Sequence, residues 1–396
     1  MRVLIRTDDL VGTSMAGSAL RAWEMGRVME SAGFETRVEA AADSSAPGPG
    51  PRLVAPGEKA WGDVLVTPPW SLRPRDLLSR NSTLILDGVT PLQAELDAMP
   101  QTEAVLRRRR RATARLPSAL ARADALLVAG KAQRRWWQQQ LGSRRPELPI
   151  LDLPFGIPDE APGDEVAELP GLPPDYAVIL WWGGVWPWLD LETLLAARAR
   201  LGRRKLSLVV PVAARPGRSA GSFGPAELRA AMKGHHLRHP EVIGLESWFP
   251  YAERGALLNR ASILAVLHHP GEEAELSFRT RAMDGLWAGV PLLLSEGGEL
   301  AELARAGGWG AATRPGDVPS TAAALELLLS ERHQQRCRQS MEDARVHWRW
   351  SRLMESLLQI LPKLPSCRRD ALIPAGCRSL MALSGWRKFG EGKRGC

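Results

Sequence analysis

The chain has 396 residues, 24% of them charged, and a formal net charge of +8. This length favours two domains over one core, and no run approaches the roughly 20 apolar residues that a membrane-spanning helix needs. The opening MRVLIRTDDL turns polar too early for a secretory signal, so we expect a cytoplasmic protein. The positive charge predicts an anionic partner, and a nucleotide, a nucleic acid or an anionic membrane surface would each fit it.

The N-terminal half alternates short apolar runs with helical segments, which is the pattern of a parallel α/β sheet. The expected strands are Val3–Ile5, Val64–Val66, Leu84–Leu86, Ala125–Val128 and Ile150–Leu153. The glycines of the loop after the first strand, Gly12 and Gly17, do not match the GxGxxG dinucleotide fingerprint. Because ligands of such sheets bind beyond the carboxyl ends of the strands, we expect Gly12 to line a cleft. The Pro- and Gly-rich stretch 44–56 is predicted to be a surface loop.

Two further features of this half carry charge. Asp87 directly follows an expected strand, where an α/β enzyme places a working carboxylate, although a turn-forming Asp-Gly pair explains it equally well. Arg107–Arg111 are five consecutive arginines, which spread around a helix as a diffuse positive surface. A solvated helix face is the simplest interpretation, and contact with anionic lipid headgroups or an anionic acceptor is the alternative. Nucleic-acid recognition is disfavoured because no aromatic base readers lie on the same helix.

A segment rich in proline and acidic residues, 154–174, is predicted to be a hinge, after which βα units resume. In the block WWGGVWPWLD a strand breaks at the Gly183-Gly184 turn, where the backbone can approach a ligand closely. Trp186 and Trp188 would form a ligand wall there or, alternatively, pack at the domain interface. Asp190 either faces the ligand or caps the helix that follows.

The stretch SFRTRAMDGLWAGVP, which starts at Ser277, predicts a helix with a charged start. Ser277 is the expected N-cap, and the unpaired N–H groups of the first turn, with Arg279 and Arg281 beside them, suit a phosphate. Helical spacing places Asp284 on this ligand-facing stripe and turns Phe278 toward the core. An ordinary amphipathic helix with solvated arginines is the alternative.

These blocks resemble the GT-B glycosyltransferases of the large retaining group called family 4, also known as glycosyl transferases group 1. The resemblance rests on residues 20–24, on WWGGVWPWLDLETLL, and on the block from FPYAERGALL through SFRTRAMDGLWAGVPLLLSEGGELAEL, and it covers most of the chain up to about residue 361. It implies two Rossmann-like domains facing a central cleft, with a nucleotide-sugar donor as substrate, a saccharide or lipid-linked acceptor, and neither metal nor cofactor. The implied parts are an acceptor-side domain (1–158), a linker (159–174), a nucleotide-sugar-binding domain (175–345), a helix crossing back to the first domain (346–361) and a basic tail (362–396).

The resemblance also implies an acidic pair. Many relatives carry two glutamates separated by seven residues, the second of them five positions before a Gly-x-Pro and in contact with the donor ribose. Asp284 takes that second position here, and its shorter carboxylate can still accept hydrogen bonds from ribose hydroxyls. Strict spacing puts Leu276 at the first position, so we assign contact with the donor sugar to Glu273, with Glu275 as the alternative.

The other implied roles follow from the same blocks. The catalytic residues would be Glu273, Arg281 and, on the acceptor side, Asp87. The N-terminal cleft loop would contribute Gly12 and Arg21. The donor-binding residues would be Gly183, Gly184, Trp186, Trp188, Asp190, Ser277, Phe278, Arg279 and Asp284.

We therefore predict a metal-independent, retaining transfer of a sugar from a nucleotide diphosphate sugar, in cell-envelope or exopolysaccharide synthesis. The alternatives are a non-catalytic anion- or nucleic-acid-binding protein on the same fold, or a sugar-nucleotide epimerase. The basic tail offers a second surface for peripheral contact with the inner face of the cytoplasmic membrane. The four cysteines lack histidines at zinc-finger spacing, so reduced thiols are expected.

Overall fold

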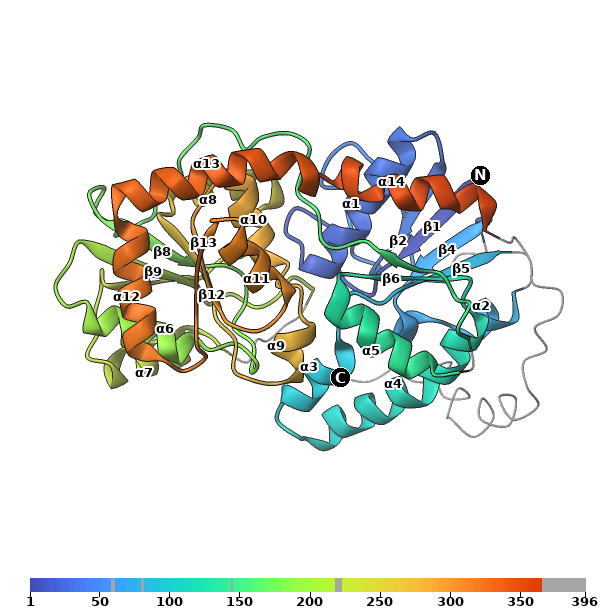
Figure 1. The fold of residues 1–396 in the computed structure, drawn as a ribbon, viewed down its shortest axis with the longest axis horizontal. Coiled ribbons are helices and arrows are strands. Elements are labelled where there is room, and N and C mark those ends of the chain that lie inside the picture. The colour runs from blue at the N-terminus through green and yellow to red at the C-terminus, as the bar shows by residue number, and fades with distance from the viewer. Residues whose placement is uncertain (58–60, 80–81, 144, 218–222, 365–396) are drawn as a thin grey trace.

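The computed structural model describes residues 1–57, 61–79, 82–143, 145–217 and 223–364. It contains two parallel β-sheets, each surrounded by helices, and the two units lie side by side (Figure 1). The predicted α/β fold with two facing domains is therefore confirmed. Most of the predicted basic tail lies outside the described residues.

The sheet of the first domain has seven parallel strands in the order β3-β2-β1-β4-β5-β6-β7. Its central strands are buried on both faces, which is why VLVT, TLIL and ALLV read as unbroken apolar runs. The loop prediction for 44–56 is wrong at β3, which pairs with β2 at the edge of the sheet. The strands are β1 (Arg2–Arg6), β2 (Glu35–Glu39), β3 (Arg52–Val54), β4 (Val64–Thr67), β5 (Thr83–Asp87), β6 (Ala125–Val128) and β7 (Ile150–Asp152).

The helices of the first domain connect these strands and pack on both faces of the sheet (Figure 1). Helix α4 contains all five consecutive arginines, and Thr102 caps its start by accepting a hydrogen bond from the backbone N–H of Val105. The helices are α1 (Gly17–Ser31), α2 (Pro74–Leu78), α3 (Leu92–Ala98), α4 (Glu103–Arg122) and α5 (Lys131–Leu141), with a short 3₁₀ helix at Pro69–Ser71.

The sheet of the second domain has six parallel strands in the order β10-β9-β8-β11-β12-β13. Its strands are β8 (Ala177–Trp181), β9 (Leu206–Pro211), β10 (Val242–Leu245), β11 (Ile263–Val266), β12 (Leu292–Ser295) and β13 (Gly310–Thr313). Its helices are α6 (Leu191–Arg200), α7 (Pro225–Gly234), α8 (Arg254–Arg260), α9 (Glu272–Leu276), α10 (Arg281–Ala288), α11 (Glu299–Ala306) and α12 (Val318–Leu329), with a 3₁₀ helix at Tyr251–Glu253.

Two consecutive helices, drawn in orange-red in Figure 1, tie the domains together. Helix α13 (Glu331–Trp348) packs on the second domain, and α14 (Trp350–Ile360), followed by a 3₁₀ turn at Leu361–Lys363, packs against α1 of the first. Between them the chain pairs with Ile157, whose N–H donates to the Trp348 carbonyl at 2.8 Å. No helix in the described part of the chain combines the length and the apolar character needed to cross a membrane.

Candidate active site

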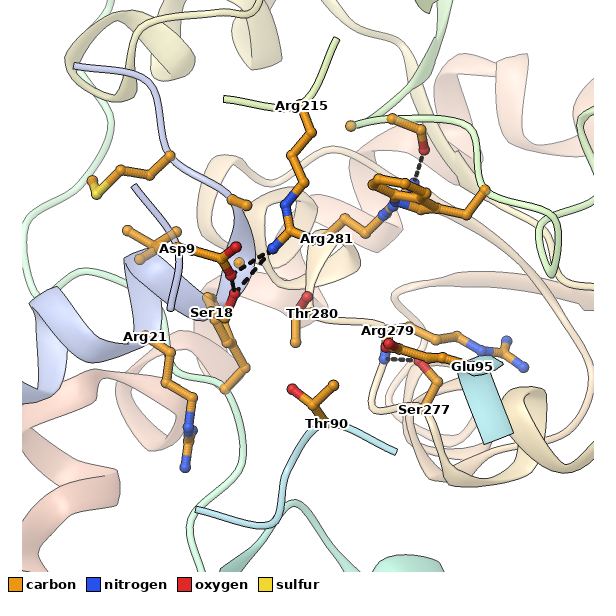
Figure 2. A pocket seen from close by; sticks show the side chains of 18 of the residues that line it. Asp9, Ser18, Arg21, Thr90, Glu95, Arg215, Ser277, Arg279, Thr280 and Arg281 are labelled. Carbon is orange, nitrogen blue, oxygen red and sulfur yellow. Dashed lines mark hydrogen bonds and ion pairs between the residues drawn. The ribbon is translucent and has the colours of Figure 1, made fainter. Parts of the chain in front are cut away.

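A cleft of about 590 Å³ opens between the two domains, and both contribute to its walls (Figure 2). The segments that directly follow β1, β5, β8 and β11 all reach it, so it lies at the carboxyl ends of both sheets. This is the edge at which open α/β sheets bind their ligands. The predicted site residues that line the cleft are Arg21, Gly183, Gly184, Trp186, Trp188, Glu273, Ser277, Phe278, Arg279, Arg281 and Asp284.

The Gly183-Gly184 turn and Arg281 meet at one wall of the cleft. Gly183 has a left-handed backbone with φ of +80°, and a Cβ at this position would lie 3.4 Å from Cζ of Arg281. Arg281 donates from Nη1 to the Gly184 carbonyl at 2.7 Å. Burial lowers the pKa of Arg281 to about 10, which leaves the guanidinium charged at neutral pH. Among the residues that the structure describes, Arg281 forms no ion pair, so its charge is available to an anionic ligand.

The helix start predicted at Ser277 is wrong. Ser277 follows the short helix α9, and α10 begins only at Arg281. Between them Arg279 adopts a left-handed backbone with φ of +55°, which a continuous helix excludes. The hydroxyl of Ser277 accepts a hydrogen bond from the Arg279 N–H at 3.2 Å instead of capping a helix. Arg281 and Asp284 still lie close together on one helix and line the cleft, because both lie in the first turn of α10.

The side chain of Arg279 is directed away from Thr280 in Figure 2 and is 2% exposed. Its guanidinium donates to the carbonyls of Ser295 and Gly297 and, at 3.3 Å, to that of Glu296. Burial lowers its pKa to about 10, so it is charged at neutral pH. Arg279 therefore fixes the loop after β12, and this contact occupies the guanidinium that was predicted to hold the donor.

Replacing Arg279 by alanine is expected to lower the free energy of unfolding by about 2–3 kcal/mol, because the buried Ser295 carbonyl and the half-buried Gly297 carbonyl lose charge-assisted hydrogen bonds. Arg281→Ala removes one hydrogen bond at the cleft wall and is the matched control, with an expected loss of about 1 kcal/mol. Urea unfolding followed by tryptophan fluorescence measures both. Equal losses would contradict the structural role of Arg279.

Glu273 and His268 form a buried pair in the wall of the cleft. Oε2 of Glu273 lies 2.8 Å from Nδ1 of His268, and the two residues are 5% and 2% exposed. Burial raises the pKa of Glu273 to about 7, whereas burial and the charges of Arg279 and Arg281 lower the pKa of His268 well below its ordinary value. A neutral His268 therefore donates from Nδ1 to Glu273. Glu275, the alternative acid, is exposed and is not among the residues lining the cleft.

The raised pKa of Glu273 predicts a pH-dependent stability. Burial raises the pKa of this carboxyl from its ordinary value of 4.5 to about 7, so the folded state binds the proton more tightly than the unfolded chain does. The contribution of Glu273 to the free energy of unfolding should therefore fall by about 3 kcal/mol as the pH rises from about 4.5 to 7. Glu273→Gln removes the titrating carboxyl and with it this contribution. In urea unfolding, the free energy of unfolding of the variant relative to that of wild type should therefore increase as the pH rises over that interval. Glu275→Gln is the control, and a parallel growth in that variant would refute the assignment.

Asp284 lines the cleft and is held by two neighbours. It accepts hydrogen bonds from Nε1 of Trp182 at 2.7 Å and from Nε of Arg254 at 3.4 Å. The guanidinium of Arg254 is in turn enclosed by aromatic rings, with Cζ lying 3.8 Å from the ring centroid of Tyr251 and 4.3 Å from that of Trp287. The carboxylate is therefore fixed in position and can still accept hydrogen bonds from a ligand hydroxyl.

Arg215 spans the cleft between the domains. Its Nη2 lies 2.5 Å from Oδ2 of Asp9 and 3.2 Å from Oγ of Ser18, both in the first domain, as Figure 2 shows. On its own domain it lies 5.9 Å from the ring centroid of Trp186, which stacks on Trp188 at 5.7 Å. Both tryptophans thus line the cleft, and Trp186 also supports a contact that holds the domains together.

Three predicted residues do not line the cleft: Gly12, Asp87 and Asp190. Oδ2 of Asp87 accepts a hydrogen bond from Nε of Arg21 at 2.8 Å, in an ion pair that anchors α1 to the sheet. Asp190 is 3% exposed and caps α6 by accepting from the Thr193 N–H at 2.9 Å, which was the alternative for this residue. Phe278 lines the cleft but is 4% exposed and packs against Trp348, as the core stripe predicted.

The consecutive arginines of α4 do not all have the same surroundings: some form exposed ion pairs, and one lines the cleft. Arg107 and Arg110 pair with Glu103 at 3.7 and 3.3 Å, and Arg109 pairs with Asp97. These are exposed pairs, in keeping with a solvated helix face. Arg108 instead lines the cleft.

Several residues of the cleft were not predicted from the sequence. Trp182 and Arg254 lie within the blocks that carry the family resemblance, but nothing in the sequence indicated that both side chains contact Asp284. Asp9, Glu95 and Arg215 had no local signal, because only the approach of the two domains brings them together. No group of three or more His, Cys, Asp or Glu side chains placed to hold a metal ion occurs within the described ranges.

Comparison with known proteins gave matches among solved structures. A scan against protein-family models gave no match, and neither did a search of curated proteins. The chain is similar to sucrose-phosphate synthase from Thermosynechococcus elongatus, with a TM-score of 0.65 and 14% identity over 92% of this chain and 99% of that one. It is similar to HepE of Anabaena in complex with UDP-glucose, with a TM-score of 0.66 and 13% identity over 92% and 100% of the two chains.

A third similar structure is WaaG, a glycosyltransferase involved in lipopolysaccharide biosynthesis, with a TM-score of 0.59 and 15% identity over 90% of this chain and 99% of WaaG. All three matches extend over nearly the whole length of both chains, so they include both domains and their arrangement. The chain has the GT-B fold of these glycosyltransferases.

Proposed function

We propose that the protein is a metal-independent, retaining glycosyltransferase that moves a sugar from a nucleotide diphosphate sugar to a saccharide or lipid-linked acceptor. The observation that carries this proposal is the Arg281 guanidinium, which is charged and unpaired by any described carboxylate, and faces the Gly183-Gly184 turn in the interdomain cleft. A diphosphate placed there would meet a fixed cation and a closely approaching backbone.

The proposed mechanism depends on stabilising the leaving diphosphate. As the bond between the sugar and the diphosphate breaks, negative charge grows on the diphosphate oxygens beside Arg281. An arginine already held by the Gly184 carbonyl needs little rearrangement to stabilise that charge. Asp284 would accept hydrogen bonds from the donor ribose, and Glu273 would contact the hydroxyls of the donor sugar.

The comparisons support the donor class and bear on the pathway. HepE is similar in fold and binds UDP-glucose, and WaaG acts in lipopolysaccharide biosynthesis. We extend these properties to this chain as part of the proposal, together with a role in cell-envelope or exopolysaccharide synthesis and cytoplasmic action at the inner face of the membrane. The exposed arginines of α4 would supply the membrane contact.

A panel of nucleotide sugars tests the proposal. Purified protein is screened for thermal stabilisation by UDP-, GDP-, ADP- and dTDP-linked sugars. A true donor at 100 times its dissociation constant should stabilise the fold by about 2.7 kcal/mol. The best donor is then assayed, in radiolabelled form, for transfer or for slow hydrolysis. Absence of both stabilisation and turnover across the panel would overturn the proposal, and interconversion of the donor sugar without an acceptor would favour an epimerase.

A further inference from the structure

Glu95 brings a carboxylate into the cleft from the domain opposite Glu273. It lies on α3, which buries Leu92, Ala94 and Leu96 in the first domain and packs against α9 of the second. Glu95 is half-buried and lines the cleft, and Figure 2 shows its side chain entering the open space from α3.

The carboxylate of Glu95 has no partner among the described residues. Neither a hydrogen bond nor an ion pair engages it, whereas the other acids on this side are occupied. Asp8 accepts from the Ser71 hydroxyl at 2.5 Å, and Asp9 binds Arg215 at 2.5 Å. A half-buried acid without a partner is costly unless a ligand uses it, so Glu95 is available to a ligand hydroxyl.

The electrostatic surroundings of Glu95 suit proton transfer near neutral pH. Burial, with a further contribution from the facing Glu273, raises the pKa of Glu95 to about 7. Arg215 and Arg108 oppose this rise, and Asp9 adds to it. A carboxyl whose pKa lies near the working pH can accept a proton and release it again.

Taking the proposed function as its basis, we infer that Glu95 is the group of the first domain that binds the attacking hydroxyl of the acceptor and takes its proton. In this step the bond between the sugar C1 and the diphosphate oxygen breaks, and its electron pair stays on the diphosphate beside Arg281. The acceptor oxygen forms the new bond to C1, and its proton passes to the Glu95 carboxylate. Because the proposed transfer is retaining, the acceptor oxygen approaches C1 from the face that the diphosphate leaves, so Glu95 and Arg281 act on the same side of the donor sugar.

Hydrolysis of the donor tests this inference with water as the acceptor. The probe is the nucleotide sugar that stabilises wild-type protein most, with UDP-glucose assayed first. Glu95→Gln should lower the hydrolysis rate about 100-fold, while the dissociation constant for the free nucleoside diphosphate changes less than about twofold. Glu95→Asp keeps a base at a different reach and should retain an intermediate rate. Asp97→Asn, on the exposed end of the same helix, is the matched control and should behave as wild type.

The outcomes separate this inference from the proposed function. Wild-type hydrolysis with an unchanged Glu95→Gln variant would overturn the role of Glu95 and leave the glycosyltransferase proposal intact. Equal losses of hydrolysis and of nucleotide binding in Glu95→Gln would overturn it in favour of a structural role at the domain contact. Failure of wild-type protein to bind any nucleotide of the panel would overturn both.

Discussion

Replacing Arg281 by alanine is expected to lower the rate of sugar transfer by about 100- to 1,000-fold, and to weaken donor binding with it. The guanidinium is the charged group that faces the Gly183-Gly184 turn, and the diphosphate of the donor would lose its fixed counter-charge there. Because the charge on the diphosphate grows as the sugar leaves, the loss should be larger in the rate than in the affinity. Isothermal titration with the donor and release of the nucleoside diphosphate measure the two quantities.

Two further variants make this result specific. Arg281→Lys keeps a positive charge but loses the planar fork, so it should fall between wild type and alanine. Arg229→Ala removes an exposed arginine of α7, outside the cleft, and should retain full activity. Full activity in Arg281→Ala would remove the observation on which the proposed donor site rests.

The predictable part of this fold has local causes. Strands β4, β5 and β6 are buried on both faces, so their sequences are apolar without alternation and stand out from the helices between them. The Gly183-Gly184 turn was recognisable for a similar reason, because a glycine pair at a strand end indicates a backbone conformation that other residues rarely adopt. Gly183 indeed has a left-handed backbone. In both cases a few adjacent residues contain all the information.

The helix start at Ser277 shows where local information ends. Ser277 is a good N-cap by composition, but the carbonyls of Ser295 and Gly297 capture the side chain of Arg279. That long-range contact accompanies a left-handed backbone at Arg279 and delays the helix to Arg281. The competing partners lie 16 and 18 positions further along the chain, beyond the reach of any helical pattern.

The acids of the cleft show the same limit at longer range. Asp87 follows its strand as a working carboxylate should, yet Arg21, 66 positions away in the sequence, holds it in an ion pair. Glu95 belongs to no recognisable motif. It lies at the cleft because α3 packs against α9 of the other domain. Which carboxylates are free for chemistry is decided by contacts between distant segments, so the sequence could indicate a cleft but not its unpaired acids.

Replacing Trp350 by alanine is expected to lower the free energy of unfolding by about 3–5 kcal/mol. Trp350 begins α14 and is 1% exposed, and its ring meets the ring of Phe155 edge-on at a centroid distance of 5.2 Å. It packs so closely on the chain leaving the first domain that a Cβ at Gly156 would lie 2.6 Å from its ring. The alanine variant leaves a cavity at the point where the crossing helix joins the first domain.

Urea unfolding and limited proteolysis at α14 measure this effect. Arg352→Ala, on the exposed side of the same helix and in an ion pair with the nearby Glu355, should change stability by less than about 0.5 kcal/mol. Gly156→Ala tests the contact from the other side, since the added methyl group must displace Trp350 and should cost about 1–3 kcal/mol. If Trp350→Ala cost no more than Arg352→Ala, the ring could not be what fastens α14 to the first domain. The expected order, Trp350→Ala above Gly156→Ala above Arg352→Ala, therefore measures how firmly α14 joins the two halves of the cleft.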